Sequence, residues 1–294
     1  MFKYFLYFSL FSPFFGSTQQ QIKGVFSPAS EFKATMLYQL SEGNATYVSY
    51  SSVNAEGEMQ IDLDASLSAG IYKLVYALPQ SEHNFEFIYN GTEAVEFNFD
   101  AETGVVFTNS KENQLLHGYT KSIASAQNEL VQLYAQPTMD TLAYKRQAQK
   151  MDSLQNSYEA QSKGTIAAHF ITASKPYIPT KVETANTYIS NVKIHYFETI
   201  NFQDAILQSS NFIVDKTLEY ILRMHFSGTP SFQDYKTNID AVNNALARTD
   251  LSYQLSTLNA LRESLITAGH DALAVYLTKT YVLPLAKQTN DTEL

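Results

Sequence analysis

Apolar residues occupy every second position in much of the first third of the chain, which is the pattern of half-buried β-strands. Met59, Ile61 and Leu63 alternate with acidic and amide side chains, so these polar neighbours belong on the face that water reaches. Similar runs occur at residues 22–26, 35–40, 46–51, 71–76, 84–90 and 95–99. Roughly seven or eight short strands separated by turn sequences predict an antiparallel β-sandwich over residues 19–108.

The Asn-Gly-Thr sequence at 90–92 is typical of a tight turn between two strands. A two-residue loop would divide the apolar side chains of the flanking strands between opposite faces of one sheet. A three-residue loop instead pairs Phe87 with Val95 and Phe85 with Phe97. We therefore expect a β-hairpin here, with a type I turn and a glycine bulge.

From about residue 109 the apolar spacing changes to that of helices. A first helix begins near Ser110, a second covers about residues 140–161, and together they predict a long αα-hairpin. Two prolines, Pro176 and Pro179, indicate a connector. Further helices are expected at residues 183–197, 206–226, 231–248, 251–268 and 270–282. The predicted fold class is α+β, an N-terminal antiparallel β-sandwich followed by an all-α helical domain over residues 109–294.

The N-terminus predicts a secretory signal peptide over residues 1–18. Lys3 precedes an apolar run at residues 4–15, which is too short to cross a bilayer, and small residues follow it. An uncleaved anchor remains the alternative. After cleavage we expect a soluble, exported protein of the periplasm or cell envelope with no transmembrane span. The final sequence NDTEL (290–294) is typical of a helix start, so we expect either a frayed tail or a chain that stops where a longer protein would continue.

Composition excludes several kinds of chemistry. The 294 residues include no Cys, which rules out thiol nucleophiles, redox Cys pairs, thiolate zinc sites and iron–sulfur clusters. The formal net charge is −9 and no basic cluster is visible, which argues against nucleic-acid binding. No glycine-rich phosphate loop, nucleophile elbow or zinc-protease motif occurs. We therefore expect no catalytic residue, no bound metal and no cofactor.

The six histidines are scattered singly along the chain. His195 and Glu198 are three residues apart and could share a helix face, although a surface contact explains such a spacing more simply than a site does. Pairs of carboxylates could act as acid and base only where burial drives their pKa values apart, and the sequence does not reveal burial.

Aromatic residues are abundant, with 20 Tyr and 19 Phe, and most of them should lie in the core. An exposed subset could form a surface for a protein partner. The candidates are Tyr47 and Tyr50 on a strand, and Tyr134 and Tyr144 near the tip of the helical hairpin.

The order of these parts resembles the N-terminal region of TlpA-like and AhpC/TSA-type thioredoxin-fold proteins exported by Bacteroidetes-type bacteria. The segments that carry the resemblance are IKGVF (22–26), GIY (70–72), NFEFIYN (84–90), ETGV (102–105), SKEN (110–113), AHF (168–170), KPYIP (175–179) and LQSSNF (207–212). They are packing and turn motifs that span nearly all of the mature chain. In that family a thioredoxin-like domain with redox cysteines follows. That domain has no counterpart here, so no catalytic residue carries over.

The resemblance and the missing cysteines together favour a non-catalytic, extracytoplasmic interaction or positioning module. Its partner would be a protein, either a thioredoxin-type domain or the clients of one. Two alternatives remain: a periplasmic hydrolase that uses carboxylates or His of the helical half, and a structural or adhesive envelope protein that uses the β domain.

Overall fold

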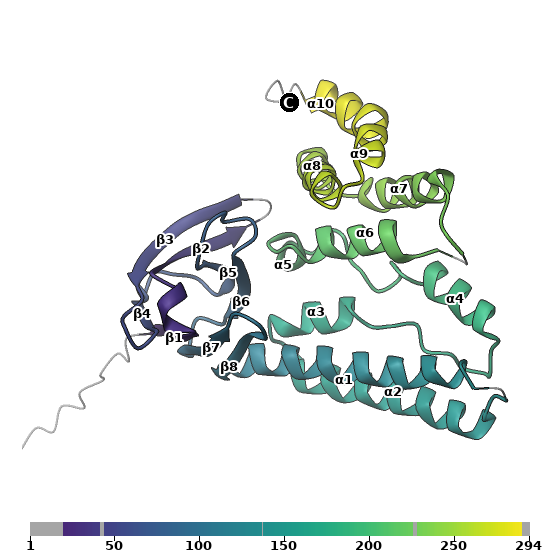
Figure 1. Ribbon diagram of the computed structural model, residues 1–294, viewed down its shortest axis with the longest axis horizontal. Helices are drawn as coiled ribbons and strands as arrows, with labels where there is room; N and C mark the ends of the chain where they lie inside the picture. Colours follow the sequence, from purple (N-terminus) through teal and green to yellow (C-terminus); the bar gives the residue numbers. More distant parts are fainter. Residues whose placement is uncertain (1–19, 42–43, 137, 226–227, 290–294) are drawn as a thin grey trace, which may run out of the picture.

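The computed structural model describes residues 20–41, 44–136, 138–225 and 228–289 (Figure 1). Within these ranges the predicted α+β class is confirmed, because strands fill the N-terminal part and helices the remainder. The predicted signal peptide (1–18) and the C-terminal segment 290–294 lie outside the described residues. In the described part of the chain, no helix combines the length and apolar character needed to cross a membrane.

The β domain is a sandwich of two four-stranded sheets, with strand orders β4-β1-β7-β8 and β3-β2-β5-β6. A short 3-10 turn at Ala29–Glu31 follows the first strand. The strands are β1 (Gln21–Ser27), β2 (Ala34–Ser41), β3 (Asn44–Ser52), β4 (Glu58–Asp62), β5 (Gly70–Val75), β6 (Asn84–Tyr89), β7 (Val95–Asp100) and β8 (Gly104–Asn109).

The hairpin predicted at residues 90–92 is wrong, because β6 and β7 belong to different sheets. β6 pairs with β5, which places Phe87 opposite Tyr72, and β7 pairs in parallel with β1. The rings of Phe85 and Phe97 do meet, with centroids 5.1 Å apart, but across the interior of the sandwich. Alternation determines which side chains point inward, and it does not determine which sheet a strand joins. The parallel β1–β7 pair also departs from the expected all-antiparallel arrangement.

The helical domain begins with the predicted αα-hairpin and continues as a stack of helices, from the α1–α2 pair to α10 (Figure 1). A π-helical segment (Thr278–Val282) joins the last two helices. The helices are α1 (Lys111–Leu133), α2 (Thr141–Ser162), α3 (Ala167–Ala173), α4 (Ala185–Ile194), α5 (Ala205–Gln208), α6 (Phe212–Arg223), α7 (Phe232–Leu246), α8 (Leu251–Thr267), α9 (Asp271–Leu277) and α10 (Leu283–Thr289).

Local capping explains several of these boundaries. The side chain of Asp140 accepts hydrogen bonds from two backbone N–H groups of α2, and Ser231 forms a capping box with Asp234 at the start of α7. The single helix predicted at residues 206–226 is instead divided into α5 and α6 by a turn at residues 209–211. Helix α3 was not expected.

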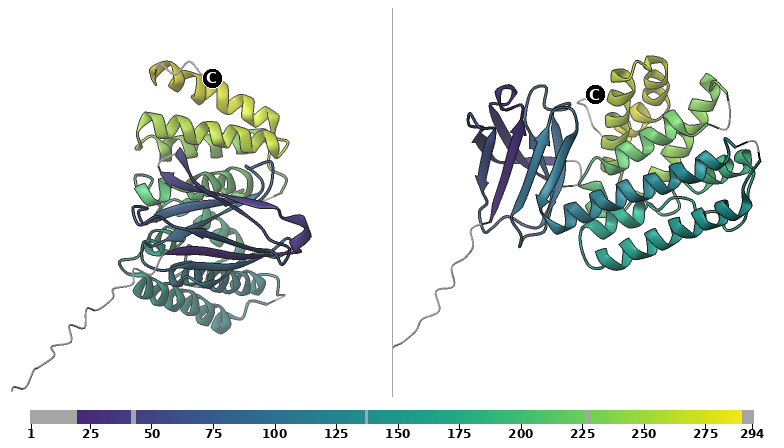
Figure 2. Two further views of the ribbon diagram at one scale, coloured as in Figure 1. Left: turned by 90° about the vertical axis from the view of Figure 1, so that its left-hand side faces the viewer. Right: turned by 60° about the horizontal axis from the view of Figure 1, so that its bottom comes forward.

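The β domain packs against the helices through the outer face of its β3-β2-β5-β6 sheet (Figures 1 and 2). Ile71 and Ile88 point away from the sandwich interior and lie in the core of the helical domain, each 2% exposed. Several polar contacts also join the domains. Asn113 of α1 bonds to the backbone of Ile88, and the Glu86 carboxylate accepts hydrogen bonds from the backbone N–H of Asn211 at the start of α6.

Candidate functional site

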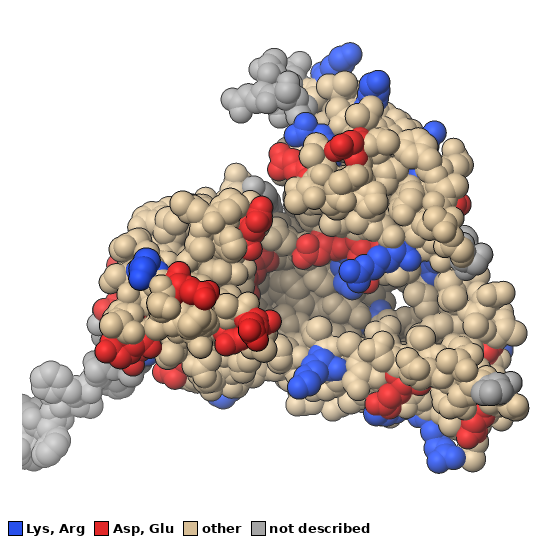
Figure 3. Space-filling model, viewed as in Figure 1, with Lys and Arg blue, Asp and Glu red and all other residues tan. Residues whose placement is uncertain are grey.

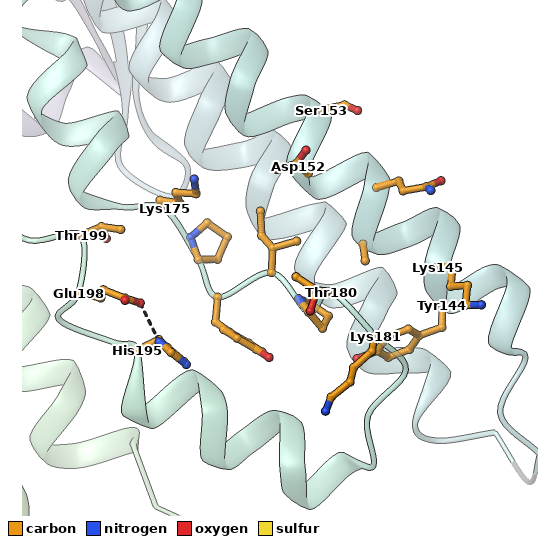
Figure 4. Close-up of a pocket in the computed structure, with 16 residues that line it drawn as sticks. Tyr144, Lys145, Asp152, Ser153, Lys175, Thr180, Lys181, His195, Glu198 and Thr199 are labelled. Carbon is orange, nitrogen blue, oxygen red and sulfur yellow. Dashed lines mark hydrogen bonds and ion pairs between the residues drawn. The ribbon is translucent and has the colours of Figure 1, made fainter.

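A groove of about 940 Å³ runs between α2 and the connector, defined here as residues 174–184 between α3 and α4 (Figure 4). We call it the connector groove. Its third wall is the turn that follows α4, which carries His195 and Glu198. Charged and aromatic side chains dominate its lining, chiefly Lys145, Lys175, Lys181, Tyr177, His195 and Glu198.

The connector is held in place by its own sequence and by contacts to α4. Pro176 and Pro179 favour extended conformations in the residues that precede them, which accounts for a segment with no regular structure. The hydroxyl of Tyr177 donates a hydrogen bond of 2.7 Å to Oε1 of Glu183. The side-chain amide of Asn191 in α4 donates hydrogen bonds to the Tyr177 hydroxyl at 3.0 Å and to Glu183 Oε1 at 2.9 Å. The groove therefore has a fixed wall.

His195 and Glu198, which the sequence singled out as a pair, do meet in this wall. His195 Nδ1 lies 2.7 Å from Glu198 Oε2, and the imidazole ring stacks on Tyr177 with centroids 5.1 Å apart and planes 9° apart. They meet in the turn that ends α4 instead of on a helix face. Within the described residues, Nε2 of His195 makes no hydrogen bond to a hydroxyl.

Three lysines give the lining of the groove an excess of basic over acidic groups. Lys145, Lys175 and Lys181 make no ion pair with any described carboxylate. The acidic groups in the lining are Asp152 and Glu198, and Glu198 is already bound to His195. Basic groups thus outnumber acidic ones in the groove, although acidic residues predominate in the chain, with 29 Asp and Glu against 20 Lys and Arg.

The four tyrosines predicted to form a partner surface do not form one surface. Tyr47 and Tyr50 lie on β3, at the edge of its sheet, and are 55% and 57% exposed. Tyr144 is only 1% exposed, so the expectation that it is exposed is wrong. Its hydroxyl lies 2.9 Å from that of Tyr134, and the Tyr134 ring in turn packs on Tyr188 of α4.

Behind the groove lies a buried carboxylate that sequence reasoning missed. Glu183 is 7% exposed, and its Oε2 has no hydrogen-bond partner among the described residues. Burial and the bond to Glu183 raise the pKa of Tyr177 to about 12, and burial with neighbouring tyrosines raises that of Tyr188 to about 12. Both tyrosines therefore stay neutral near pH 7, and Tyr177 lines the groove. The sequence signal was limited to the KPYIP segment, which combines prolines, an aromatic ring and a charge.

A second cavity, of about 430 Å³, lies between α1, α3 and α6, and we call it the α6 cavity. Asp215 and Glu219 of α6 contribute its acidic groups. Burial and the neighbouring Glu219 charge raise the pKa of Asp215. Burial also acts to raise the pKa of Glu219, but hydrogen bonds from Tyr196 and Lys216 outweigh it and leave that pKa lowered. Figure 3 shows a hollow between the β domain and the helices, with acidic and basic side chains on its walls.

Neither cavity has a set of ligands for a metal ion. Among the described residues, no group of three or more His, Asp or Glu side chains is arranged to hold one. Comparison with models of protein families, with curated proteins and with solved structures gave no significant match to this chain.

Proposed function

We propose that the protein is an exported, non-catalytic interaction module that holds an extended acidic segment of a protein partner in the connector groove. The observation that carries this proposal is the presence of three lysines without ion-pair partners beside the stacked rings of Tyr177 and His195. Unpaired cations in a groove favour an anionic occupant, and flat aromatic surfaces favour contact with a peptide backbone or side chain.

The positions of the lysines indicate the shape of the occupant. Lys175 stands at one end of the connector, whereas Lys145 and Lys181 both lie toward the other (Figure 4). Residues 175–181 can span at most roughly 20 Å. An extended peptide of about six or seven residues covers the same length, so acidic side chains near both of its ends would meet the lysines.

The resemblance to exported thioredoxin-fold proteins supports a protein partner, either a thioredoxin-type domain or its clients. The lack of Cys supports the non-catalytic part of the proposal, since a chain without thiols cannot exchange disulfides itself. The purified chain should therefore not reduce insulin disulfides above background. Turnover by the chain alone would contradict this part of the proposal.

The hydrolase alternative gains less from the structure. Asp215 and Glu219 do have pKa values shifted in opposite directions, as acid–base catalysis requires. However, they lie one turn apart on the same helix, so both approach the cavity from one side, and Glu219 is engaged by Tyr196 and Lys216. Carboxylate hydrolases place their two groups on opposite sides of the bond that breaks. The positions of these two carboxylates therefore favour a binding site over a hydrolytic one.

One observation favours the structural or adhesive alternative as a second candidate. β3 is an edge strand without any charged residue, and it exposes Tyr47 and Tyr50. Such an edge can pair with a strand of another copy. If it does, sedimentation should show assembly that rises with protein concentration and that Tyr47→Lys with Tyr50→Lys abolishes.

The main proposal is tested with a fluorescent octaglutamate peptide and the chain without its predicted signal peptide. Octaglutamate should bind more tightly than octaglutamine, and added salt should weaken its binding. Replacing all three groove lysines by Gln should weaken binding by about threefold to a hundredfold, because each exposed ion pair contributes roughly 0.2–1 kcal/mol and three contribute about 0.6–3 kcal/mol.

A matched variant controls for total charge. Lys121, Lys163 and Lys279 are exposed lysines outside the groove lining, and replacing them by Gln removes the same charge. This variant should bind octaglutamate almost as the unaltered chain does. If both triple variants lost the same affinity for octaglutamate, net charge alone would explain the binding, and the assignment of the peptide to the groove would be overturned. Equal binding of octaglutamate and octaglutamine would overturn the choice of an acidic occupant.

A further inference from the structure

Aromatic rings from three helices line the α6 cavity. Tyr119 of α1, Phe170 of α3 and Phe212 of α6 all line it. The rings of Phe170 and Phe212 meet edge to face, with centroids 5.6 Å apart and planes at 77°. Leu116 and Ile123 of α1 add aliphatic surface. A cavity of about 430 Å³ with this lining falls within the size range of small-molecule sites.

The charged groups at this cavity are unevenly partnered. Lys216 lies 3.2 Å from Glu219 and also sits over the ring of Tyr196, 5.7 Å from its centroid. Glu219 additionally accepts a hydrogen bond from the Tyr196 hydroxyl. Asp215, in contrast, makes no side-chain hydrogen bond or ion pair within the described residues. Of the two acidic groups among the described lining residues of the cavity, Asp215 is therefore the one without a side-chain hydrogen bond or ion pair.

Asp215 keeps access to solvent, yet protein atoms surround its carboxylate closely enough for burial to raise its pKa. The nearby negative charge of Glu219 acts in the same direction, and Lys216 only partly opposes it. A cation placed beside Asp215 would therefore relieve an unfavourable interaction that the protein itself leaves in place.

We propose that the α6 cavity binds a small organic ammonium ion, with its apolar body against Phe170 and Phe212 and its ammonium group on Asp215. Aromatic rings attract cations through their negative faces, and a carboxylate adds a charge-assisted hydrogen bond. A neutral molecule of the same shape would gain only the apolar contact. An anion would meet the charges of Asp215 and Glu219. This site is separate from the connector groove and takes a ligand of opposite charge.

Phenethylammonium is the probe for calorimetry or ligand-observed NMR, with 2-phenylethanol as its neutral counterpart and 3-phenylpropionate as its anionic one. The ammonium should bind saturably in the millimolar range or below, and at least about tenfold more tightly than either counterpart. Asp215→Asn should remove most of this preference. Ala124→Phe should weaken binding by filling the cavity, because Ala124 is an exposed residue of the lining that can be enlarged without disturbing the core.

Asp152→Asn is the matched control, because it removes an exposed carboxylate from the connector groove instead. It should leave phenethylammonium binding unchanged, and circular dichroism should show that all three variants are folded. Three results would overturn the proposal: no saturable binding in the millimolar range, equal binding of the neutral alcohol, or an undiminished affinity in Asp215→Asn and Ala124→Phe. Because the probe is not an acidic peptide, failure here leaves the proposal for the connector groove intact.

Discussion

Asn113 joins the two domains, because its side chain bonds to the backbone of Ile88 as a neighbouring strand would. β6 is the edge of its sheet, so the outward backbone groups of Ile88 have no neighbouring strand. The Asn113 amide accepts a hydrogen bond of 2.8 Å from Ile88 N–H and donates one of 2.7 Å to its carbonyl. A third bond, of 2.7 Å, runs to Ser110 Oγ. Asn113 is 4% exposed and Ile88 is 2% exposed, so water does not replace these bonds easily.

Replacement of Asn113 by Leu, which is similar in size, tests this contact. The change leaves the N–H and the carbonyl of Ile88 buried without partners, and each such group costs about 1–3 kcal/mol. Added apolar burial of the leucine offsets about 1–2 kcal/mol of this cost. We therefore expect the free energy of unfolding to fall by roughly 2–4 kcal/mol.

Urea denaturation measures this loss, and hydrogen exchange at the Ile88 amide locates it. The control is Gln114→Leu, since Gln114 is an exposed neighbour whose side chain also bonds backbone carbonyls, those of Phe107 and Thr108. Water can satisfy those carbonyls, so this variant should change the free energy of unfolding by only about 0.5 kcal/mol. If Asn113→Leu costs no more than Gln114→Leu, the bonds to Ile88 do not hold the domains as described.

Three further predictions concern the β domain. Phe87→Ala should lower the free energy of unfolding by about 3–5 kcal/mol because the ring is 3% exposed, and a loss below about 1 kcal/mol in a denaturant titration would contradict its burial. Gly24→Ala should cost about 1–3 kcal/mol because its Cβ would lie 2.2 Å from the tightly packed Phe97 ring, whereas Gly70→Ala, with open space around it, should be neutral. Burial raises the pKa of Glu86 from 4.5 to about 7, so between these pH values the folded state retains a proton that the unfolded chain releases. The free energy of unfolding should therefore fall as the pH rises from 4.5 to about 7. Glu86→Gln should abolish this fall, as measured by the midpoints of urea denaturation.

Periodicity alone predicted most elements of the fold. Alternation located β1 to β7, and a change of period near residue 109 located the start of the helical domain. The pairing of the strands was predicted wrongly. Phe85 and Phe97 belong to strands that are adjacent in sequence and opposite in space, and a two-residue period describes a hairpin and a crossover equally well. The break between α5 and α6 was missed for a similar reason, because the apolar spacing continues through the turn at residues 209–211.

The candidate sites were less accessible to sequence reasoning. His195 and Glu198 were singled out because they are three positions apart in the sequence, and their contact is confirmed. The lysines of the connector groove come from two segments, so only the tertiary fold brings Lys145 near Lys181. Tyr144 was wrongly expected to be exposed, because helical periodicity does not show which residues of other elements cover a side chain.

The two cavities differ in what makes them specific, and this difference follows from how their charges are paired. In the connector groove Glu198 is hydrogen-bonded to His195, and the three lysines outnumber the two carboxylates of the lining, which favours an anion. In the α6 cavity the basic group Lys216 is engaged by Glu219, which leaves Asp215 free for a cation. The sign of the excess charge in each cavity thus sets the sign of ligand that it should accept. Exchanging Glu219 for Gln should release Lys216 toward Asp215 and weaken phenethylammonium binding, while octaglutamate binding stays unchanged.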